Sequence, residues 1–428
     1  MFFSTCSAIT AVIQSANPDP IQQVATAPAG TQAAQIDIKS AYRCIPTCYE
    51  HLPHLVVSIT KSCHEDTEVF IDRCHPFGLR LSGGNLGLAL DATIDILTCI
   101  LTIWFWAKWV DDIVPICRRC TDGSYDVDLD NIIKWFAYLG WPLSLEKLHD
   151  FAAIVRYIGF DWDFDLKVVS LPKDKRIKFL GRVTSWIHDA SHQGVTIEQT
   201  KQLLGTLSHI SNIHRIGRSF LPATQSFLVA FYAIAKRHHE RAIRFIRIRL
   251  SAATISDITV WHDLLTIQSA SRSLSINPLV DPNVWVDASS DWGIAIVMEG
   301  QWHAWKLLPG WNSCSHDIGW AESVALEFAI YHLIWAGFSH VRLLIHSDSQ
   351  GTIGQYNKGR GKNQSTNNCI CRSVASMLHA HIDVIPEYVR SEDNIADDPL
   401  RGWNLDNGLK LTQAFEIPKA IRHLLVDV

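Results

Sequence analysis

Residues 108–114 read KWVDDIV, and the two aspartates at their centre decide how the first half of the chain folds. The apolar residues on either side of Asp111 and Asp112 are typical of two short β-strands, so the stretch predicts a β-hairpin with the acids at its turn. Adjacent carboxylates repel each other unless a cation neutralises them. A D-D pair taken alone is most often just a turn, so its meaning depends on what else the chain brings to it.

A third acid, Asp37, interrupts the strand-like stretch QIDIK at residues 35–39. A carboxylate among apolar neighbours is costly to bury unless it is paired or bound to a metal. If the hairpin packs beside this strand, Asp37, Asp111 and Asp112 converge. Such a set offers only oxygen ligands, which suit Mg²⁺ rather than zinc. Two such ions can activate a 3′-hydroxyl and stabilise leaving pyrophosphate.

The composition indicates a globular chain with more than one domain. The chain has 428 residues, 47% of them hydrophobic and 19% charged, which excludes a disordered or fibrous protein. The longest strongly apolar run, residues 96–107, is shorter than the ~20 residues needed to span a bilayer. Eleven cysteines argue against a secreted disulfide scaffold. We therefore expect an intracellular protein (cytoplasm or nucleus) without a membrane partner.

Charge is distributed unevenly although the net charge is only −5. Residues 166–250 hold 15 Lys and Arg against 4 Asp and Glu, whereas residues 281–403 hold 8 against 14. Five basic residues of the middle segment recur near helical spacing: Lys236, Arg237, Arg241, Arg244 and Arg247. This ridge suits the phosphates of a nucleic-acid duplex. The alternative is an ordinary solvated helix face.

Four further acids stand in the second half of the chain, where predicted strands alternate with helices as in an α/β domain. Asp287 ends an apolar strand, Glu322 lies in the first turns of a helix, Asp348 ends another strand, and Asp397 lies in the late acidic loop EDNIADDPLRG. Lone acids at strand ends are mostly solvated caps. Glu327, five residues after Glu322, is expected to point elsewhere on the helix.

The stretches DIKSAYRCIP (residues 37–46), CHPFGLRLSGGNLG (74–87) and KWVDDIV resemble motifs A, B and C of reverse transcriptases from DIRS-like and related fungal retroelements. The resemblance implies that Asp37, Asp111 and Asp112 hold the catalytic metals and that Tyr42 is the steric gate under the incoming sugar. It further places Phe77 and Gly78 in the template-facing segment, and makes Lys147 a general acid toward pyrophosphate. Only 36 residues precede Asp37, too few for the family's fingers subdomain, so we expect poor polymerase activity.

The second set of acids resembles the D-E-D-D set of ribonuclease H domains, because Asp287, Glu322, Asp348 and Asp397 follow in the order strand, helix, strand and loop. The ending N-x-A-D-x-x-x-R, residues 394–401, resembles that of the retroelement versions, with Pro399 and Leu400 as departures. The resemblance implies two Mg²⁺ ions, with Mn²⁺ as a substitute, and cleavage of the RNA strand of an RNA–DNA hybrid.

The predicted fold is therefore a combination of α/β and α+β domains. We expect an N-terminally truncated, ferredoxin-like α+β palm in residues 1–165, a helical thumb and connection in 166–275, a ribonuclease H-like α/β domain in 281–403 and a C-terminal tail in 404–428. The expected partners are an RNA–DNA hybrid or primer–template, and deoxynucleoside triphosphates if the polymerase works. Two alternatives remain open: a nuclease whose polymerase half is only scaffold, and an inactive nucleic-acid-binding relic of a retrotransposon.

Overall fold

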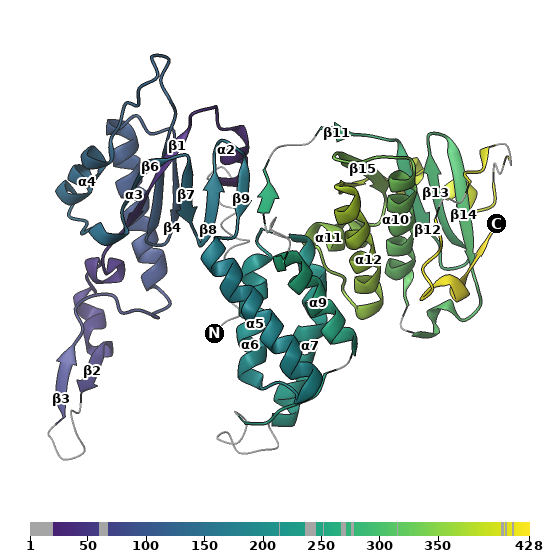
Figure 1. Cartoon of the computed structure of the whole chain (residues 1–428), viewed down its shortest axis with the longest axis horizontal. Coiled ribbons are helices and arrows are strands. Elements are labelled where there is room, and N and C mark those ends of the chain that lie inside the picture. The colour runs from purple at the N-terminus through teal and green to yellow at the C-terminus, as the bar shows by residue number, and fades with distance from the viewer. Residues whose placement is uncertain are drawn as a thin grey trace. The chain divides into compact units, whose positions relative to one another are not determined.

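The computed structural model describes residues 20–59, 67–213, 215–235, 245–250, 252–266, 271–274, 278–314, 316–403, 406, 409–412 and 415–428. It is a mixed α/β structure with several sheets (Figure 1). The chain divides into two compact units: unit 1 comprises residues 1–173 and 271–275, and unit 2 comprises residues 174–270 and 276–428. Both ends of the segment 166–275, which was predicted to be a helical thumb and connection, therefore belong to unit 1.

The centre of unit 1 is a four-stranded antiparallel sheet in the order β4-β5-β1-β6. Its strands are β1 (Gln32–Asp37), β4 (Phe105–Trp109), β5 (Asp112–Cys117) and β6 (His149–Ala152). The strands β4 and β5 form the predicted hairpin, in which Trp109 pairs with Asp112 and leaves Val110 and Asp111 as the turn. Val110 has a φ of 54°, which a β-branched residue rarely adopts, so the turn beside the paired aspartates is strained.

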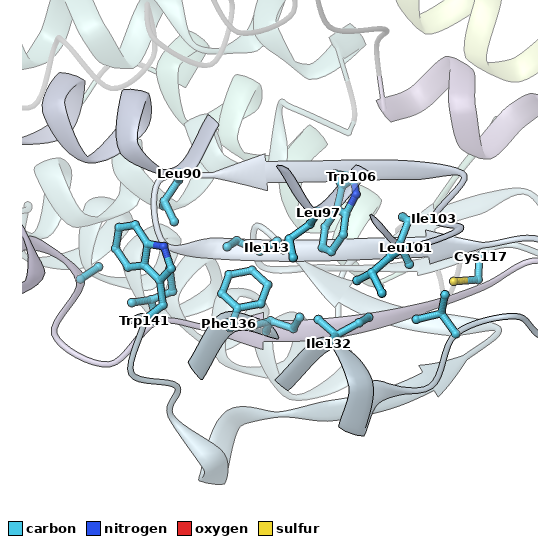
Figure 2. Close-up of a cluster of buried hydrophobic side chains, with 14 of the residues drawn as sticks. Leu90, Leu97, Leu101, Ile103, Trp106, Ile113, Cys117, Ile132, Phe136 and Trp141 are labelled. Carbon is cyan, nitrogen blue, oxygen red and sulfur yellow. The ribbon is translucent and has the colours of Figure 1, made fainter. Parts of the chain in front are cut away.

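One face of this sheet is covered by the helices α3 (Ser82–Ile100) and α4 (Leu129–Tyr138), whose apolar side chains share a core with the strands. In Figure 2, Leu97, Trp106 and Phe136 lie in this core, and the Trp106 and Phe136 ring centroids are 6.5 Å apart. Ile36, Ile38 and Ile113 belong to the same cluster. Because side chains alternate along a strand, Asp37 and Asp112 project from the opposite face.

Among the described helices, α3 alone is long and apolar enough to cross a bilayer by length and composition. Its buried residues, among them Leu86, Leu90 and Leu97, are part of the core over the sheet. A core helix passes the same test, so these two properties do not by themselves indicate a membrane span.

Unit 1 also contains the helix α2 (Pro20–Thr26), a second antiparallel sheet in the order β10-β9-β8-β7, and a two-stranded ribbon. The strands of the second sheet are β7 (Ile154–Tyr157), β8 (Phe160–Asp163), β9 (Val168–Ser170) and β10 (Ser271–Ser273), and those of the ribbon are β2 (Val56–Ile59) and β3 (Glu68–Ile71). Ile158 and Gly159, with φ of 45° and 83°, form the turn that reverses the chain between β7 and β8. The strand β10 pairs with β9 although about 100 residues separate them in the chain.

In the described residues, unit 2 begins with the helices α5 (Lys173–His192), α6 (Ile197–Ile210), α7 (Pro222–Ala235) and α9 (Ala252–Thr266). A capping box starts α6, because the Thr196 side chain accepts from the Gln199 amide while the Gln199 side chain accepts from the Thr196 amide. Gly217 fits closely against the buried Trp261, whose ring would lie 2.2 Å from a Cβ at that position. These contacts lie in the segment 166–275, which the sequence predicted to be helical.

The rest of unit 2 is a seven-stranded sheet with helices. The strands are β11 (Leu279–Val280), β12 (Val284–Ala288), β13 (Gly293–Met298), β14 (Gln301–Leu307), β15 (Arg342–Ser347), β16 (Asp383–Tyr388) and β17 (Leu425–Asp427). The helices are α10 (Ile318–Trp335), α11 (Gln350–Lys358), α12 (Gln364–Ala380) and α13 (Asp397–Leu400). The strand β15 runs parallel to β11, β12 and β16, whereas β12, β13 and β14 form an antiparallel meander.

The C-terminal segment, which the sequence left without a role, belongs to this sheet. β17 pairs with β14. Phe415 contacts the rings of Phe328, Tyr331 and His332 with centroids 4.9–5.1 Å away. The segment therefore closes one edge of the sheet and covers part of α10.

Candidate functional site

The first set of acids lies on the face of the unit 1 sheet that α3 and α4 leave uncovered. Asp37 ends β1 and stands opposite Asp112 in the antiparallel pairing of β1 with β5. Directly opposed residues have their side chains side by side on one face of a sheet. Asp111 precedes Asp112 in the strained turn. The strand and the hairpin are therefore adjacent, as the sequence predicted, although the metal-binding role remains a prediction.

Lys147 contacts this set directly. It lies in the 3₁₀ turn η3 (Leu145–Lys147), and its Nζ is 3.0 Å from Oδ2 of Asp37. The hydrogen bond to Asp37, then the charge of Asp37, raise the pKa of the Lys147 ammonium, and the charges of Asp111 and Asp112 add to the shift. All three acids thus raise the pKa of the same lysine.

The other residues predicted to bind a nucleotide are Tyr42, Phe77 and Gly78. The rings of Tyr42 and Phe77 meet edge to face, with centroids 5.4 Å apart. Burial raises the pKa of the Tyr42 phenol, and the charge of Asp111 adds to that effect, which places Tyr42 near the hairpin turn. Phe77 is 89% exposed, and Gly78 has a φ of 94° that favours glycine.

The second set of acids converges more closely. Asp287 lies near the end of β12, Glu322 in the first turns of α10, and Asp348 directly after β15. One ligand oxygen from each lies within 4.8 Å of the others, and in the part of the chain that the structure describes this is the one group of three His, Cys, Asp or Glu residues so close together. Asp287 and Glu322 are buried, at 7% and 8% exposure.

The electrostatics of this second set are unfavourable without a cation. Burial, and then the charges of Asp287 and Asp348, raise the pKa of Glu322 from 4.5 to about 9. Burial, and then the charge of Asp348, raise the pKa of Asp287 from 3.8 to about 7. Within the described residues, Oε2 of Glu322 is buried without a hydrogen-bond partner. A divalent cation would remove this repulsion and give that oxygen a ligand bond.

Asp397 begins α13 and is held by Arg401, whose Nε donates to Oδ1 at 2.8 Å. Its charge contributes to the raised pKa of Asp287, so it lies within electrostatic reach of the three converging acids. Ser391 donates a hydrogen bond to Oδ2 of Asp348. Arg401 and Ser391 were missed as site residues. The spacing of four between Asp397 and Arg401 was a usable signal, whereas Ser391 gave none.

Glu327 is separate from this group, as its spacing from Glu322 predicted. Its carboxylate is fully buried and accepts two hydrogen bonds from Arg372 of α12, at 2.6 and 2.7 Å. Burial alone would lower the pKa of the Arg372 guanidinium, but the contact with Glu327 raises it overall. This pair joins α10 to α12.

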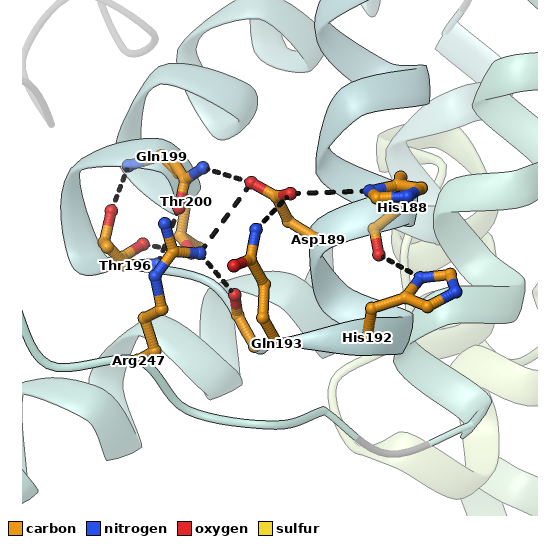
Figure 3. Close-up of polar contacts among 9 residues, drawn as sticks. His188, Asp189, His192, Gln193, Thr196, Gln199, Thr200 and Arg247 are labelled. Atoms are coloured by element: carbon orange, nitrogen blue, oxygen red, sulfur yellow. Dashed lines mark hydrogen bonds and ion pairs between the residues drawn. The ribbon is translucent and has the colours of Figure 1, made fainter.

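Of the five residues predicted to contact phosphates, Lys236, Arg237, Arg241 and Arg244 lie outside the described residues. Arg247 is described, and Figure 3 shows its guanidinium beside Asp189. Its Nη1 donates to the Gly194 carbonyl at 2.9 Å and lies 3.8 Å from a carboxylate oxygen of Asp189. Gln193 and Gln199 also donate to Asp189. Arg247 therefore joins its own segment to the α5–α6 corner, while its side chain stays 39% exposed.

No family model and no curated protein matches the chain. Solved structures of the foamy viral protease-reverse transcriptase do match. The structure in complex with an RNA/DNA hybrid has a TM-score of 0.43 and 12% identity, and the match covers 95% of this chain and 49% of that one. Two structures with double-stranded DNA have TM-scores of 0.39 and 0.38 and identities of 13% and 14%, and 88% of this chain is covered against 60% and 71% of theirs. The chain thus spans about half the length of the first of these proteins, and at these scores the similarity does not assign a family.

Proposed function

We propose that unit 2 hydrolyses phosphodiester bonds of nucleic acid with divalent metal ions held by Asp287, Glu322 and Asp348. The observation that carries this proposal is their convergence within 4.8 Å, with two of the three carboxylates buried. Lone surface acids are stable as free carboxylates, but a buried set of this kind must either retain protons or bind a cation. Asp397, held near the set by Arg401, is proposed as the fourth acid.

The donor set fits Mg²⁺ or Mn²⁺. It consists of carboxylate oxygens, and the buried Oε2 of Glu322 has no partner among the described residues. The chemistry that two such ions supply is an activated water and charge compensation at the leaving 3′-oxygen.

The chain's own residues give this site a defined proton state and shape. With raised pKa values, Glu322 and Asp287 retain protons near neutral pH until a cation displaces them. Ser391 orients the Asp348 carboxylate and Arg401 orients that of Asp397. Together they hold the acids ready to bind a cation without large rearrangement of the backbone.

The proposed substrate is the RNA strand of an RNA–DNA hybrid. The order of the four acids and the N-x-A-D-x-x-x-R ending, which resemble those of ribonuclease H domains, support this choice. Contacts to 2′-hydroxyl groups would distinguish the RNA strand from the DNA strand.

A second candidate function is nucleotidyl transfer at the first set of acids. The cross-strand pair Asp37–Asp112 and the position of Tyr42 near Asp111 favour it. Its partners would be a primer–template and deoxynucleoside triphosphates. We rank it second because Asp37 is engaged by Lys147, whereas the three acids of the second set converge without a basic side chain among them in the part of the chain that the structure describes.

Hybrid cleavage and primer extension on one preparation with Mg²⁺ test both functions. We expect RNA cleavage that Asp348→Asn abolishes, because losing one carboxylate unbalances the charge that holds both ions. The matched control is Asp383→Asn, at an exposed aspartate at the start of β16, which should cut normally. Extension without cleavage would reverse the ranking. A folded protein inactive in both assays would favour an inactive nucleic-acid-binding relic.

A further inference from the structure

We infer that the Lys147 ammonium is the resident counter-cation of the first set of acids, so that a divalent ion binds there only by displacing it. The inference concerns unit 1 and does not depend on hydrolysis by unit 2. It predicts that the two sets of acids bind metal ions with different affinity. Substituting Lys147 should remove the cause of this difference.

The contact itself is direct. Nζ of Lys147 is 3.0 Å from Oδ2 of Asp37, and the Asp37 side chain is only 9% exposed. The ammonium occupies one lone pair of this oxygen and neutralises the charge of Asp37, so it competes with a metal ion for the carboxylate. The second set offers a contrast, because its three oxygens lie within 4.8 Å of one another.

The backbone that carries Lys147 is fixed to the strand that carries Asp37. The Lys39 amide donates to the Pro142 carbonyl, and the Ser144 amide donates to the Asp37 carbonyl, both at 2.9 Å. The Lys147 amide donates to the Ser144 carbonyl to close η3. The lysine is therefore held beside Asp37 by main-chain hydrogen bonds, and its four-carbon side chain is the part that can move.

Displacement of the ammonium should be easy. The Lys147 side chain is 59% exposed, so a released ammonium enters water with little rearrangement of the protein. A divalent ion brings twice the charge of the ammonium to Asp37, Asp111 and Asp112 and can replace it, at a cost in apparent affinity.

Mn²⁺ binding, followed by electron paramagnetic resonance on the full chain, tests the inference without an activity readout. Asp287→Asn and Asp348→Asn in the same chain remove the second set, so the remaining signal reports the first. On this background we expect Lys147→Met to lower the Kd for Mn²⁺ about tenfold. Lys134→Met, at an exposed lysine of α4, should leave it unchanged. Adding Asp37→Asn to Lys147→Met should abolish the tight binding.

Three further measurements complete the test. Lys147→Arg retains the cation and should bind Mn²⁺ no more tightly than the parent, and circular dichroism should show that each variant is folded. Reductive ¹³C-methylation should give a Lys147 signal that shifts on adding Mg²⁺, as the side chain leaves Asp37. Unchanged or weaker Mn²⁺ binding by folded Lys147→Met, or an unshifted lysine signal at saturating Mg²⁺, would overturn the inference.

Discussion

Two buried glutamates on one helix should respond to the same substitution in opposite directions. Glu322 and Glu327 are five residues apart on α10, at 8% and 0% exposure. Glu322 has one oxygen without a partner in the described structure, whereas Glu327 is bound by Arg372 through two hydrogen bonds. We expect Glu322→Gln to stabilise the metal-free protein at alkaline pH and Glu327→Gln to destabilise it.

The magnitude follows from linkage between pKa and stability. The folded pKa of Glu322 is raised, so its neutral form stabilises the fold below pH 4.5, and this stability is lost as pH rises toward about 9. At 1.36 kcal/mol per pH unit between these values, the upper bound of the loss is ~6 kcal/mol. Asp287 titrates in the same range and shares the protons, so we expect about half of this for Glu322 alone. Glutamine does not ionise, so the variant avoids the loss.

Calorimetry in EDTA between pH 5 and pH 9 is the assay. At pH 8, which lies 3.5 pH units above 4.5, the gain is ~2.4 kcal/mol, which corresponds to ~5–10 °C in the Tm of a unit this size, and it should shrink toward zero at pH 5. Glu327→Gln leaves the half-buried Arg372 without its charged partner, and should cost ~3 kcal/mol at both pH values. A pH-independent or destabilising effect of Glu322→Gln would refute the view that this carboxylate is buried without compensation.

Further outcomes are expected from the same structure. Mg²⁺ at 100 times its Kd should stabilise unit 2 by ~2.7 kcal/mol at pH 8, measured as a Tm shift that Asp348→Asn removes. Phe415→Ala should destabilise unit 2 by ~2–3 kcal/mol in urea unfolding, because its half-buried ring contacts Phe328, Tyr331 and His332. Asp427→Asn should cost under ~1 kcal/mol, since that carboxylate is 47% exposed although it contacts His303. Changing Arg237, Arg241 and Arg244 to Ala should weaken duplex binding and lower the salt slope by ~0.9 for each phosphate that the protein no longer neutralises, whereas an unchanged slope would indicate a solvated helix face.

The sequence predicted those parts of the fold that depend on local pattern. The hairpin at residues 105–117 follows from alternating apolar residues around two aspartates, and α10 follows from a long apolar helix pattern. The acids Asp287 and Asp348 were found because each follows an apolar strand. In each case the signal lies within about a dozen residues.

The features that the sequence did not predict depend on unusual turns or on contacts between distant residues. The turn between β7 and β8 gives no ordinary turn signal, because it uses Ile158 at positive φ, where a β-branched residue is disfavoured, and lacks the usual Asn-Gly or Asp-Gly pair. The engagement of Asp37 by Lys147 joins residues 110 positions apart, and that of Asp348 by Ser391 joins residues 43 apart. No spacing rule relates such pairs, because the fold alone brings them together.

The two sets of acids solve the same electrostatic problem in different ways, and the difference connects stability with function. In the first set a lysine forms an ion pair with Asp37, whereas in the second set two buried carboxyls retain protons. A cation that binds the second set displaces the protons and removes the repulsion between the carboxylates. The same repulsion that destabilises the metal-free fold at alkaline pH therefore favours metal binding. It follows that Glu322→Gln, which should stabilise the metal-free protein, should also weaken metal binding. A variant that gained stability and kept full Mg²⁺ affinity would break this connection.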